Sequence, residues 1–203
     1  MSSEEAKNVS AINRPPKSYL CMPRPKLEYG SFSVEAVQPQ HIESIRQWRN
    51  AQMDILRQTS EITREQQEAY FREHIWSDML SPQPKNLLLA YMENGNPIGY
   101  GGLVHIAWEH RRAEVSFLLE TSLASENEKY RLYFSNFIYL IKVLAFQCLN
   151  MQKIFTETYA NRNFHISVLE ENHFYREGVL RHHVWIGNQP VDSIINGCIK
   201  NDE

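Results

Sequence analysis

Cysteine and positive charge are both scarce in this 203-residue chain. Its three cysteines, Cys21, Cys148 and Cys198, are widely spaced and odd in number, so they predict no disulfide framework and favour a reducing, cytoplasmic location. Lys and Arg together number 21 against 24 Asp and Glu, for a formal net charge of −3. Because a phosphate backbone is bound mainly by basic excess, we expect no nucleic-acid partner.

Long apolar runs and metal-ligand motifs are also missing. No stretch reaches the roughly 18 consecutive apolar residues that a membrane-spanning helix needs, and the first ten residues are polar and acidic, unlike a signal peptide. The eight histidines include no H-x-x-x-H or HExxH pair, and no CxxC occurs. We therefore expect neither a membrane partner nor a metal site.

The composition that is present suits one folded domain with a short extension. Hydrophobic residues make up 42% of the chain and charged residues 22%, which is enough for a packed core. Residues 1–29 contain Pro15, Pro16, Pro23 and Pro25 and little apolar periodicity. We interpret them as an extended N-terminal arm that lies on the domain or on a neighbouring subunit. Residues 30–203 form the predicted domain.

Apolar periodicity predicts an α/β domain with a mixed sheet. Strands are expected at residues 32–37, 87–92, 98–108, 112–119, 153–159, 179–186 and 193–199, and helices at 41–50, 63–80, 130–150 and 164–171. The run 87–92 is continuously apolar and predicts a strand buried on both faces. Glu93-Asn-Gly-Asn96 predicts a hairpin turn. The glycines in 98–108 predict a bulge or a close backbone approach.

Three local motifs follow one another along the chain in the order that they have in a known protein family. They are Asn96-Pro-Ile-Gly-Tyr-Gly-Gly102, Arg112-Ala-Glu-Val-Ser-Phe-Leu-Leu119, and Lys153 to Asn161 followed by His165 to Phe174 and Arg176-Glu-Gly178. Together they resemble the GCN5-related N-acetyltransferase (GNAT) superfamily over about residues 30–200, nearest to its ribosomal-protein-alanine and amino-sugar-nucleotide subfamily. The resemblance implies a mixed, mostly antiparallel sheet that splays between residues 112–119 and 153–159, with helices on both faces.

The resemblance also implies a function. Members of the family transfer an acetyl group from acetyl-CoA directly to an amine. Residues 191–197 resemble the closing strand of the amino-sugar members, so a nucleotide-linked amino sugar is the expected small-molecule acceptor, with a protein N-terminus as the next alternative. The family's pantetheine arm pairs with a strand, which places the backbone of Phe117, Leu118 and Leu119 beside the cofactor. Asn161 is expected to bond the pantetheine amides or to cap the following turn.

One departure from the family pattern concerns the pyrophosphate loop, which is normally rich in glycine. No glycine lies between residues 103 and 177; one alignment puts Tyr130 and Leu132 at the glycine positions, and another puts Ser125 and Asn127 there. In one interpretation the N–H cradle survives, and Lys129, Tyr130 and Arg131 line the phosphate site, with the two basic residues adding charge. In the other, the site is lost, and the fold is a non-catalytic binding module or uses a different acyl donor.

The catalytic candidates are Glu114, His105 and Tyr175. Glu114 lies where family members often place an acidic base, and a register in which residue numbers sum to about 219 would set His105 opposite it. A His–Glu pair could shuttle a proton, although both could equally form a structural polar pair. The family's general-acid tyrosine position holds Leu169. Tyr175 is the nearby candidate, with structural packing as its alternative.

The first predicted helix supplies the acceptor candidates. In this family the first helix and the loop after it form the acceptor wall, so Arg46, Trp48 and Arg49 are expected to contact the substrate. A guanidinium suits a nucleotide phosphate or a carboxylate; an exposed helix charge is the alternative for Arg49. The proline-rich arm and the exposed sheet edges of this fold allow a homodimer.

Overall fold

A computed structural model describes residues 15–202 of the chain. Its strands are β1 (Lys26–Tyr29), β2 (Phe32–Ala36), β3 (Leu87–Glu93), β4 (Asn96–Ala107), β5 (Arg112–Leu119), β6 (Lys153–Tyr159), β7 (Tyr175–Ile186) and β8 (Gln189–Ile199). Its α-helices are α1 (Pro39–Ala51), α2 (Arg64–Tyr70), α3 (Trp76–Met79), α4 (Thr121–Ala124), α5 (Asn127–Lys142) and α6 (Asn163–Glu171). The π-helical stretches Phe71–Ile75 and Val143–Cys148 continue α2 and α5, which makes the predicted long helices continuous.

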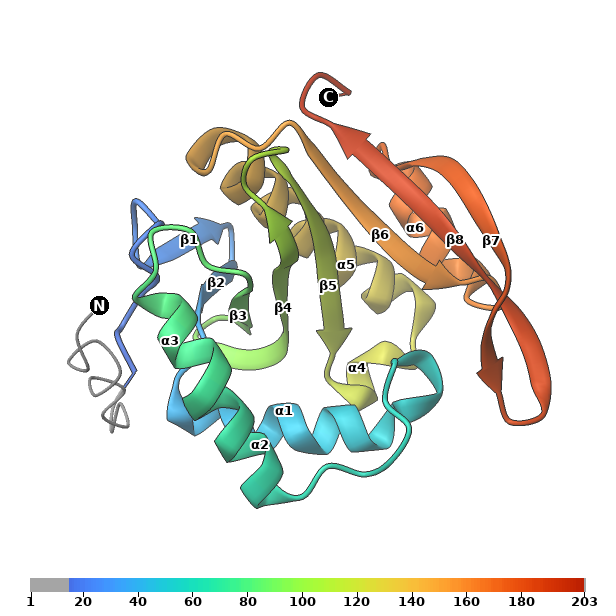
Figure 1. Cartoon of the computed structure of the whole chain (residues 1–203), viewed down its shortest axis with the longest axis horizontal. Helices are drawn as coiled ribbons and strands as arrows, with labels where there is room; N and C mark the ends of the chain where they lie inside the picture. The colour runs from blue at the N-terminus through green and yellow to red at the C-terminus, as the bar shows by residue number, and fades with distance from the viewer. Residues whose placement is uncertain (1–14, 203) are drawn as a thin grey trace, which may run out of the picture.

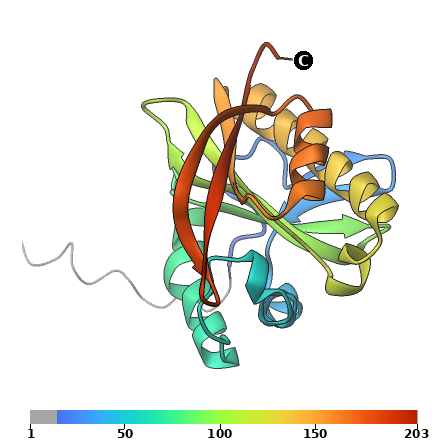
Figure 2. The ribbon, with the colours of Figure 1, turned by 90° about the vertical axis from the view of Figure 1, so that its right-hand side faces the viewer.

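The eight strands form one sheet in the order β1-β2-β3-β4-β5-β6-β8-β7 (Figure 1). Every neighbouring pair is antiparallel except β5 and β6, which are parallel. Helices α5 and α6 cover one face of the sheet, and α1 and α2 lie on the other (Figures 1 and 2). The predicted mixed, mostly antiparallel sheet with helices on both faces is confirmed.

The sheet splays between β5 and β6, as predicted. The two strands pair only from Arg112 to Glu114 on β5 with Lys153 to Phe155 on β6. Beyond this short ladder they diverge (Figure 1), so one edge of each strand loses its neighbour in the middle of the sheet. An edge of this kind presents unpaired backbone N–H and C=O groups. It therefore creates a place where an extended ligand can pair with the chain.

Residues 15–29, the described part of the predicted N-terminal extension, contribute to the sheet and to the core. Strand β1 pairs with β2 along its whole length. Upstream of it, Tyr19 is only 1% exposed, and its hydroxyl accepts a hydrogen bond from the Leu88 N–H at 2.9 Å. Tyr19, Met22 and Leu27 are all buried, so apolar burial holds this segment against the rest of the domain. Residues 1–14 of the predicted extension lie outside the described residues.

The core lies mainly between the sheet and α5. This helix buries Phe134, Phe137 and Ile141 to 1% exposure or less, and the Phe134 ring stacks on Phe117 of β5 with centroids 4.5 Å apart. All six residues of the predicted doubly covered run 87–92 are buried. Among the described helices, none is long and apolar enough to cross a membrane.

Candidate functional site

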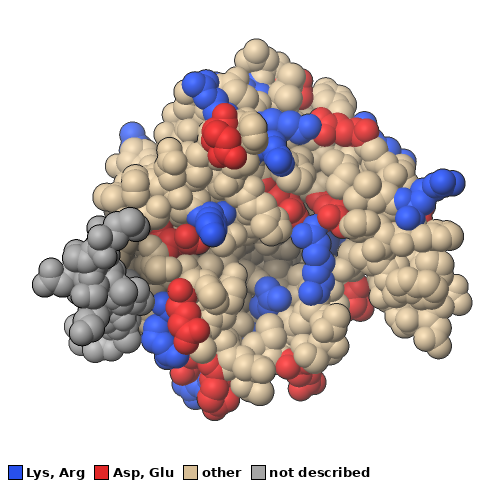
Figure 3. All heavy atoms as spheres, viewed as in Figure 1, with Lys and Arg blue, Asp and Glu red and all other residues tan. Residues whose placement is uncertain are grey.

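A cavity of about 360 Å³ opens where β5 and β6 separate. Its walls come from β4, β5 and β6, from helices α1, α5 and α6, and from the loop between α1 and α2. Figure 3 shows the same face of the molecule hollowed near its centre, with basic and acidic side chains around the hollow. A volume of this size suits a small ligand.

His105 and Glu114 meet at this cavity. The predicted register is off by one, because Val104 rather than His105 is the partner of Glu114. A bulge follows Val104, and His105 adopts a φ of +49°, which is uncommon for a residue other than glycine. The bulge turns the imidazole so that Nδ1 lies 2.8 Å from Glu114 Oε2. The two residues thus contact each other as expected, through a bulge that lies within the predicted strand 98–108 but beyond its glycines.

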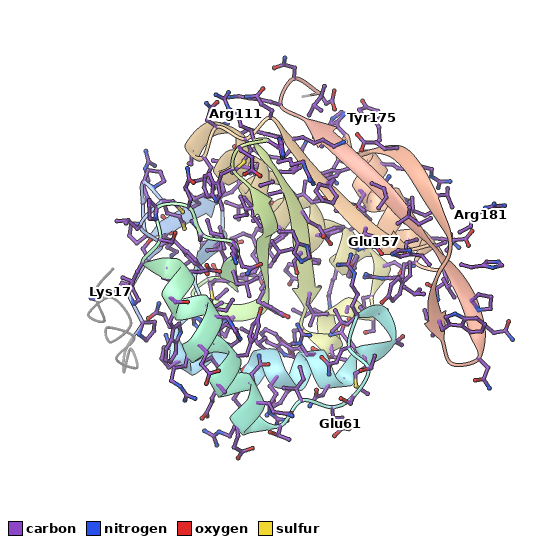
Figure 4. All side chains as sticks on the ribbon, in the orientation of Figure 1. Lys17, Glu61, Arg111, Glu157, Tyr175 and Arg181 are labelled. Atoms are coloured by element: carbon purple, nitrogen blue, oxygen red, sulfur yellow. The ribbon has the colours of Figure 1, made fainter. Side chains whose placement is uncertain are left out.

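Arg57 ties the two sides of the cleft together. It lies in the loop between α1 and α2, and its Nη2 donates to Glu114 Oε1 and to Glu157 Oε2, both at 2.9 Å. The side chains of Glu114 and Glu157 are only 12% and 15% exposed. In Figure 4, Glu157 lies on β6 beside the gap that separates this strand from β5. The guanidinium offsets the repulsion between the two carboxylates and holds Glu114 in place from the side opposite His105.

The backbone of β5 offers free groups at alternate residues. The Glu120 N–H bonds to Ile98 on β4, so even-numbered residues of β5 pair with β4 and odd-numbered ones point toward the cleft. Phe117 therefore directs its N–H and C=O at the cleft, whereas Leu118 directs its own at β4. The Leu119 carbonyl accepts from Gln52 Nε2 at 2.9 Å. Of the three residues predicted to line the cofactor, Phe117 alone keeps both backbone groups available.

Helix α5 begins without the glycines that the family has in its pyrophosphate loop. No residue from 112 to 149 has a positive φ, so no conformation in this segment requires glycine. The first N–H groups of α5, from Asn127 to Lys129, have no carbonyl partner within the helix. Lys129 is bound to Glu126 at 2.8 Å, and Arg131 lies 3.4 Å from Glu171. The backbone donors of a phosphate cradle are present, but its basic side chains already have acidic partners.

Tyr130 does not line a phosphate site, contrary to the prediction. Its side chain is 8% exposed and packs beneath the cleft, where its hydroxyl lies 2.6 Å from His165 Nδ1 and accepts from Arg162 at 3.3 Å. Burial raises the pKa of Tyr130 to about 12. Burial, and then the charge of Arg162, lower the pKa of His165 well below 6.5. His165 is therefore neutral, and in the tautomer that carries its proton on Nε2 the Tyr130 hydroxyl donates to Nδ1.

The neutral His165 predicts a specific loss of stability in acid. Its folded-state pKa is depressed, so between that value and its unfolded value of 6.5 the unfolded chain binds a proton that the folded chain does not. Stability therefore falls as the pH drops below 6.5, by at most about 1.4 kcal/mol per pH unit from this group. We expect His165→Asn to weaken the pH dependence of the unfolding free energy, measured with urea between about pH 7.5 and 5.5.

The matched control for this prediction is His110→Asn. His110 is exposed in the turn between β4 and β5, so this variant should keep the wild-type slope. An unchanged slope in His165→Asn would show that folding does not change the protonation of His165 and would contradict the prediction.

Of the remaining predicted residues, Arg49 lines the cavity and the others do not. Arg46 faces elsewhere, bound to Glu43 at 2.7 Å, and Trp48 packs partly buried against the core. Tyr175 does not reach the cavity, because it begins β7, which pairs only with β8; it is 57% exposed and lies far from Glu157 in Figure 4. Asn161 is exposed in the turn after β6 and caps nothing among the described residues.

Three charged residues of the cavity wall were not predicted from the sequence: Arg57, Glu157 and Arg162. A signal existed for Glu157, because a charged residue between two threonines in a central strand is unusual and alternates onto the cleft face. Arg57 lies in an irregular loop, where periodicity gives no information. Within residues 15–202, no group of three or more His, Cys, Asp or Glu could hold a metal ion.

Comparisons with known proteins agree with this geometry. The family model described as "Acetyltransferase (GNAT) domain" matches residues 34–195. The crystal structure of spermidine N-acetyltransferase from Vibrio cholerae, in complex with CoA and spermine, is similar with a TM-score of 0.73 and 17% identity; the match covers 85% of this chain and 97% of that one. A dodecameric structure of the V. cholerae enzyme is similar with a TM-score of 0.69 and 18% identity, over 84% and 94% of the two chains.

These identities are low, so the likeness to solved structures shows the fold alone. No curated protein matches the chain.

Proposed function

The chain belongs to the acetyltransferase (GNAT) domain family, and we propose that it transfers an acetyl group from acetyl-CoA to a primary amine of a small molecule. The observation that carries this proposal is the His105–Glu114 pair, which opens on a cavity where two central strands separate. A base beside a strand edge is the arrangement that direct acyl transfer from an extended thioester requires.

The donor would lie along the cleft between β5 and β6. The N–H and C=O of Phe117 would pair with pantetheine amides, as an added strand pairs with a sheet edge. The free N–H groups at the start of α5 would donate hydrogen bonds to the pyrophosphate oxygens. Residues Lys129 and Arg131 would add charge by exchanging their carboxylate partners for phosphate oxygens, which both can do because they are half exposed.

The chemistry would need one base and no covalent enzyme intermediate. The neutral amine nitrogen attacks the thioester carbonyl, a C–N bond forms and the C–S bond breaks; the proton that the amine loses passes by way of His105 to the departing sulfur, so that CoA leaves as the thiol. Glu114 would hold the Nδ1–H of His105, which leaves Nε2 free to take the amine proton. Arg57 would keep the Glu114 carboxylate oriented toward His105.

The acceptor we propose first is a nucleotide-linked amino sugar, by resemblance to the amino-sugar subfamily. The V. cholerae neighbour, which binds spermine, makes a polyamine the other amine to test. A cytoplasmic location and a homodimer also belong to this proposal. The oligomeric assembly of a neighbour and the exposed edge strand β7 support self-association.

A different acyl donor is the second candidate. Glu126 and Glu128 flank the first turn of α5 and oppose a pyrophosphate there. A donor whose pantetheine is carried on a protein lacks the pyrophosphate, so the same two carboxylates would not exclude it. A non-catalytic binding role is the remaining alternative.

Acetyl-CoA binding decides among these functions. We expect saturable binding in the micromolar range by titration calorimetry, with similar binding of CoA and desulfo-CoA, because the strand edge and the α5 donors bind parts common to all three. Thiol release in the presence of an amine panel would then show transfer. No binding at millimolar acetyl-CoA would contradict the proposal. Transfer from an acyl-carrier protein in that case would support the second donor.

A further inference from the structure

A second cavity of about 320 Å³ adjoins the first and is not used by the reaction proposed above. It lies between α1, α2 and β4. The two cavities share Arg49, Tyr70, Val104 and Ser116 in their walls. Val104 directly precedes His105, so the second cavity opens beside the proposed base. A molecule with its amine at His105 could extend into this space.

Arg49 brings an uncompensated positive charge to this cavity. Its Nη1 donates to the Tyr100 hydroxyl at 2.7 Å and its Nε to Gln58 Oε1 at 3.1 Å, both neutral partners. Within residues 15–202, no carboxylate lies within ion-pair distance of Arg49, whereas its helix neighbour Arg46 is paired with Glu43 and the loop residue Arg57 with two carboxylates. A guanidinium has five N–H donors, so Arg49 keeps donors free for an anion.

Gln67 supplies a second, independent sign of a missing ligand. It lines the same cavity from α2 and is only 3% exposed. Its side-chain amide makes no hydrogen bond to any residue in the described part of the chain. Neither polar atom of this amide is among the fully buried, unpartnered atoms of the described residues, so the amide faces the cavity and is open to a polar group of a bound molecule. Arg49 and Gln67 together form the donor set that binds a carboxylate or phosphate oxygen.

We propose that this second cavity binds an anionic group of the acceptor. The acceptor would then be an amine that also carries a carboxylate or a phosphate, with the anion on Arg49 and Gln67 and the amine at His105. This inference rests on the proposed acetyl transfer. It selects against polyamines, because a second ammonium group would face the unpaired Arg49 guanidinium.

Matched amines test the inference with the full chain and saturating acetyl-CoA. Serine is compared with serinamide, phosphoethanolamine with ethanolamine, and spermidine is added as the polycation. We expect kcat/KM to be at least about tenfold higher for an anionic amine than for its neutral partner. The larger ratio of kcat/KM identifies the anion that the site prefers. Serine against serinamide tests a carboxylate, and phosphoethanolamine against ethanolamine tests a phosphate. Equal rates within both pairs, or a preference for spermidine, would overturn the inference.

Arg49→Gln tests the residue itself. We expect KM for the anionic amine to rise at least about tenfold with little change in kcat, since the lost contact is made in the ground state as well as in the transition state. Arg46→Gln is the control on the same helix, because Arg46 lines neither cavity, and its KM should stay at the wild-type value. An unchanged KM in Arg49→Gln would contradict the assignment.

A binding measurement separates this inference from the proposed transfer. Serine and phosphoethanolamine are titrated into the protein and into Arg49→Gln without acetyl-CoA. Binding that Arg49→Gln abolishes supports the anion site even if acetyl-CoA does not bind and transfer fails. Acetyl-CoA binding without any binding or turnover of either anionic amine overturns the anion site and leaves the proposed transfer standing.

Discussion

Glu114→Gln is expected to lower kcat by about 10²- to 10⁴-fold while leaving acetyl-CoA affinity unchanged, since this is the range that a positioned acid or base contributes. The substitution keeps the shape of the side chain but removes the carboxylate that holds His105 Nδ1 at 2.8 Å. Without it, the imidazole loses its fixed tautomer and orientation. Steady-state kinetics with the best amine, together with acetyl-CoA titration, measures both quantities.

Two further variants separate catalysis from structure. Glu157→Gln removes the other carboxylate on Arg57 but does not touch His105, so its kcat should stay within about tenfold of wild type. His105→Asn removes the base, and asparagine tolerates the positive φ at this position. Because Glu114 acts through His105, the double variant Glu114→Gln/His105→Asn should have a kcat no lower than that of His105→Asn alone.

A Glu114→Gln variant that keeps more than about a third of wild-type kcat would contradict this mechanism. Its stability is measured by urea unfolding as well, because the Glu114 side chain is only 12% exposed and breaking a largely buried ion pair can destabilise a fold. A loss of activity without a loss of stability is therefore the informative outcome.

Most of the fold could be predicted because its signals are local. The apolar run 87–92 and the turn Glu93-Asn-Gly-Asn96 specify a buried strand and a hairpin by themselves, and both occur. The positive φ values of Asn94 and Gly95 are those that a two-residue hairpin turn needs. Strand β1 escaped prediction because its four residues, Lys-Leu-Glu-Tyr, are too short to show a period.

The site was harder to predict because it depends on non-local geometry. His105 and Glu114 were named from their strands, but their contact depends on a bulge after Val104, a position that the glycines earlier in the same strand do not specify. Tyr130 was assigned by alignment to a phosphate loop, yet an aromatic residue gains more by burial against Phe117 and Phe134 than by facing solvent. Arg57 reaches Glu157 across 100 positions of sequence, a separation at which pattern arguments give no information.

Gly101→Ala is expected to destabilise the fold by more than about 3 kcal/mol, at the upper end of the overpacking range. A methyl group on Gly101 of β4 would clash with the Ser116 carbonyl oxygen and would lie 2.9 Å from Phe117 Cα and 2.8 Å from Phe137 Cζ. Two of these three atoms are backbone of β5, which cannot move aside as a side chain can. Urea unfolding measures the loss, which is a large share of the roughly 5–15 kcal/mol that stabilises a domain.

Gly178→Ala is the matched control for this prediction. It is also in a strand, its φ is not positive, and a methyl group there would meet nothing within 4 Å, so its stability should change by no more than about 0.5 kcal/mol. The difference between the two variants isolates the close approach of β4 and β5. That approach sets how far His105 lies from Glu114, because both follow the same pair of strands. Any folded Gly101→Ala protein should therefore also lose transferase activity, and a loss below about 1 kcal/mol would show that the two strands can separate without cost.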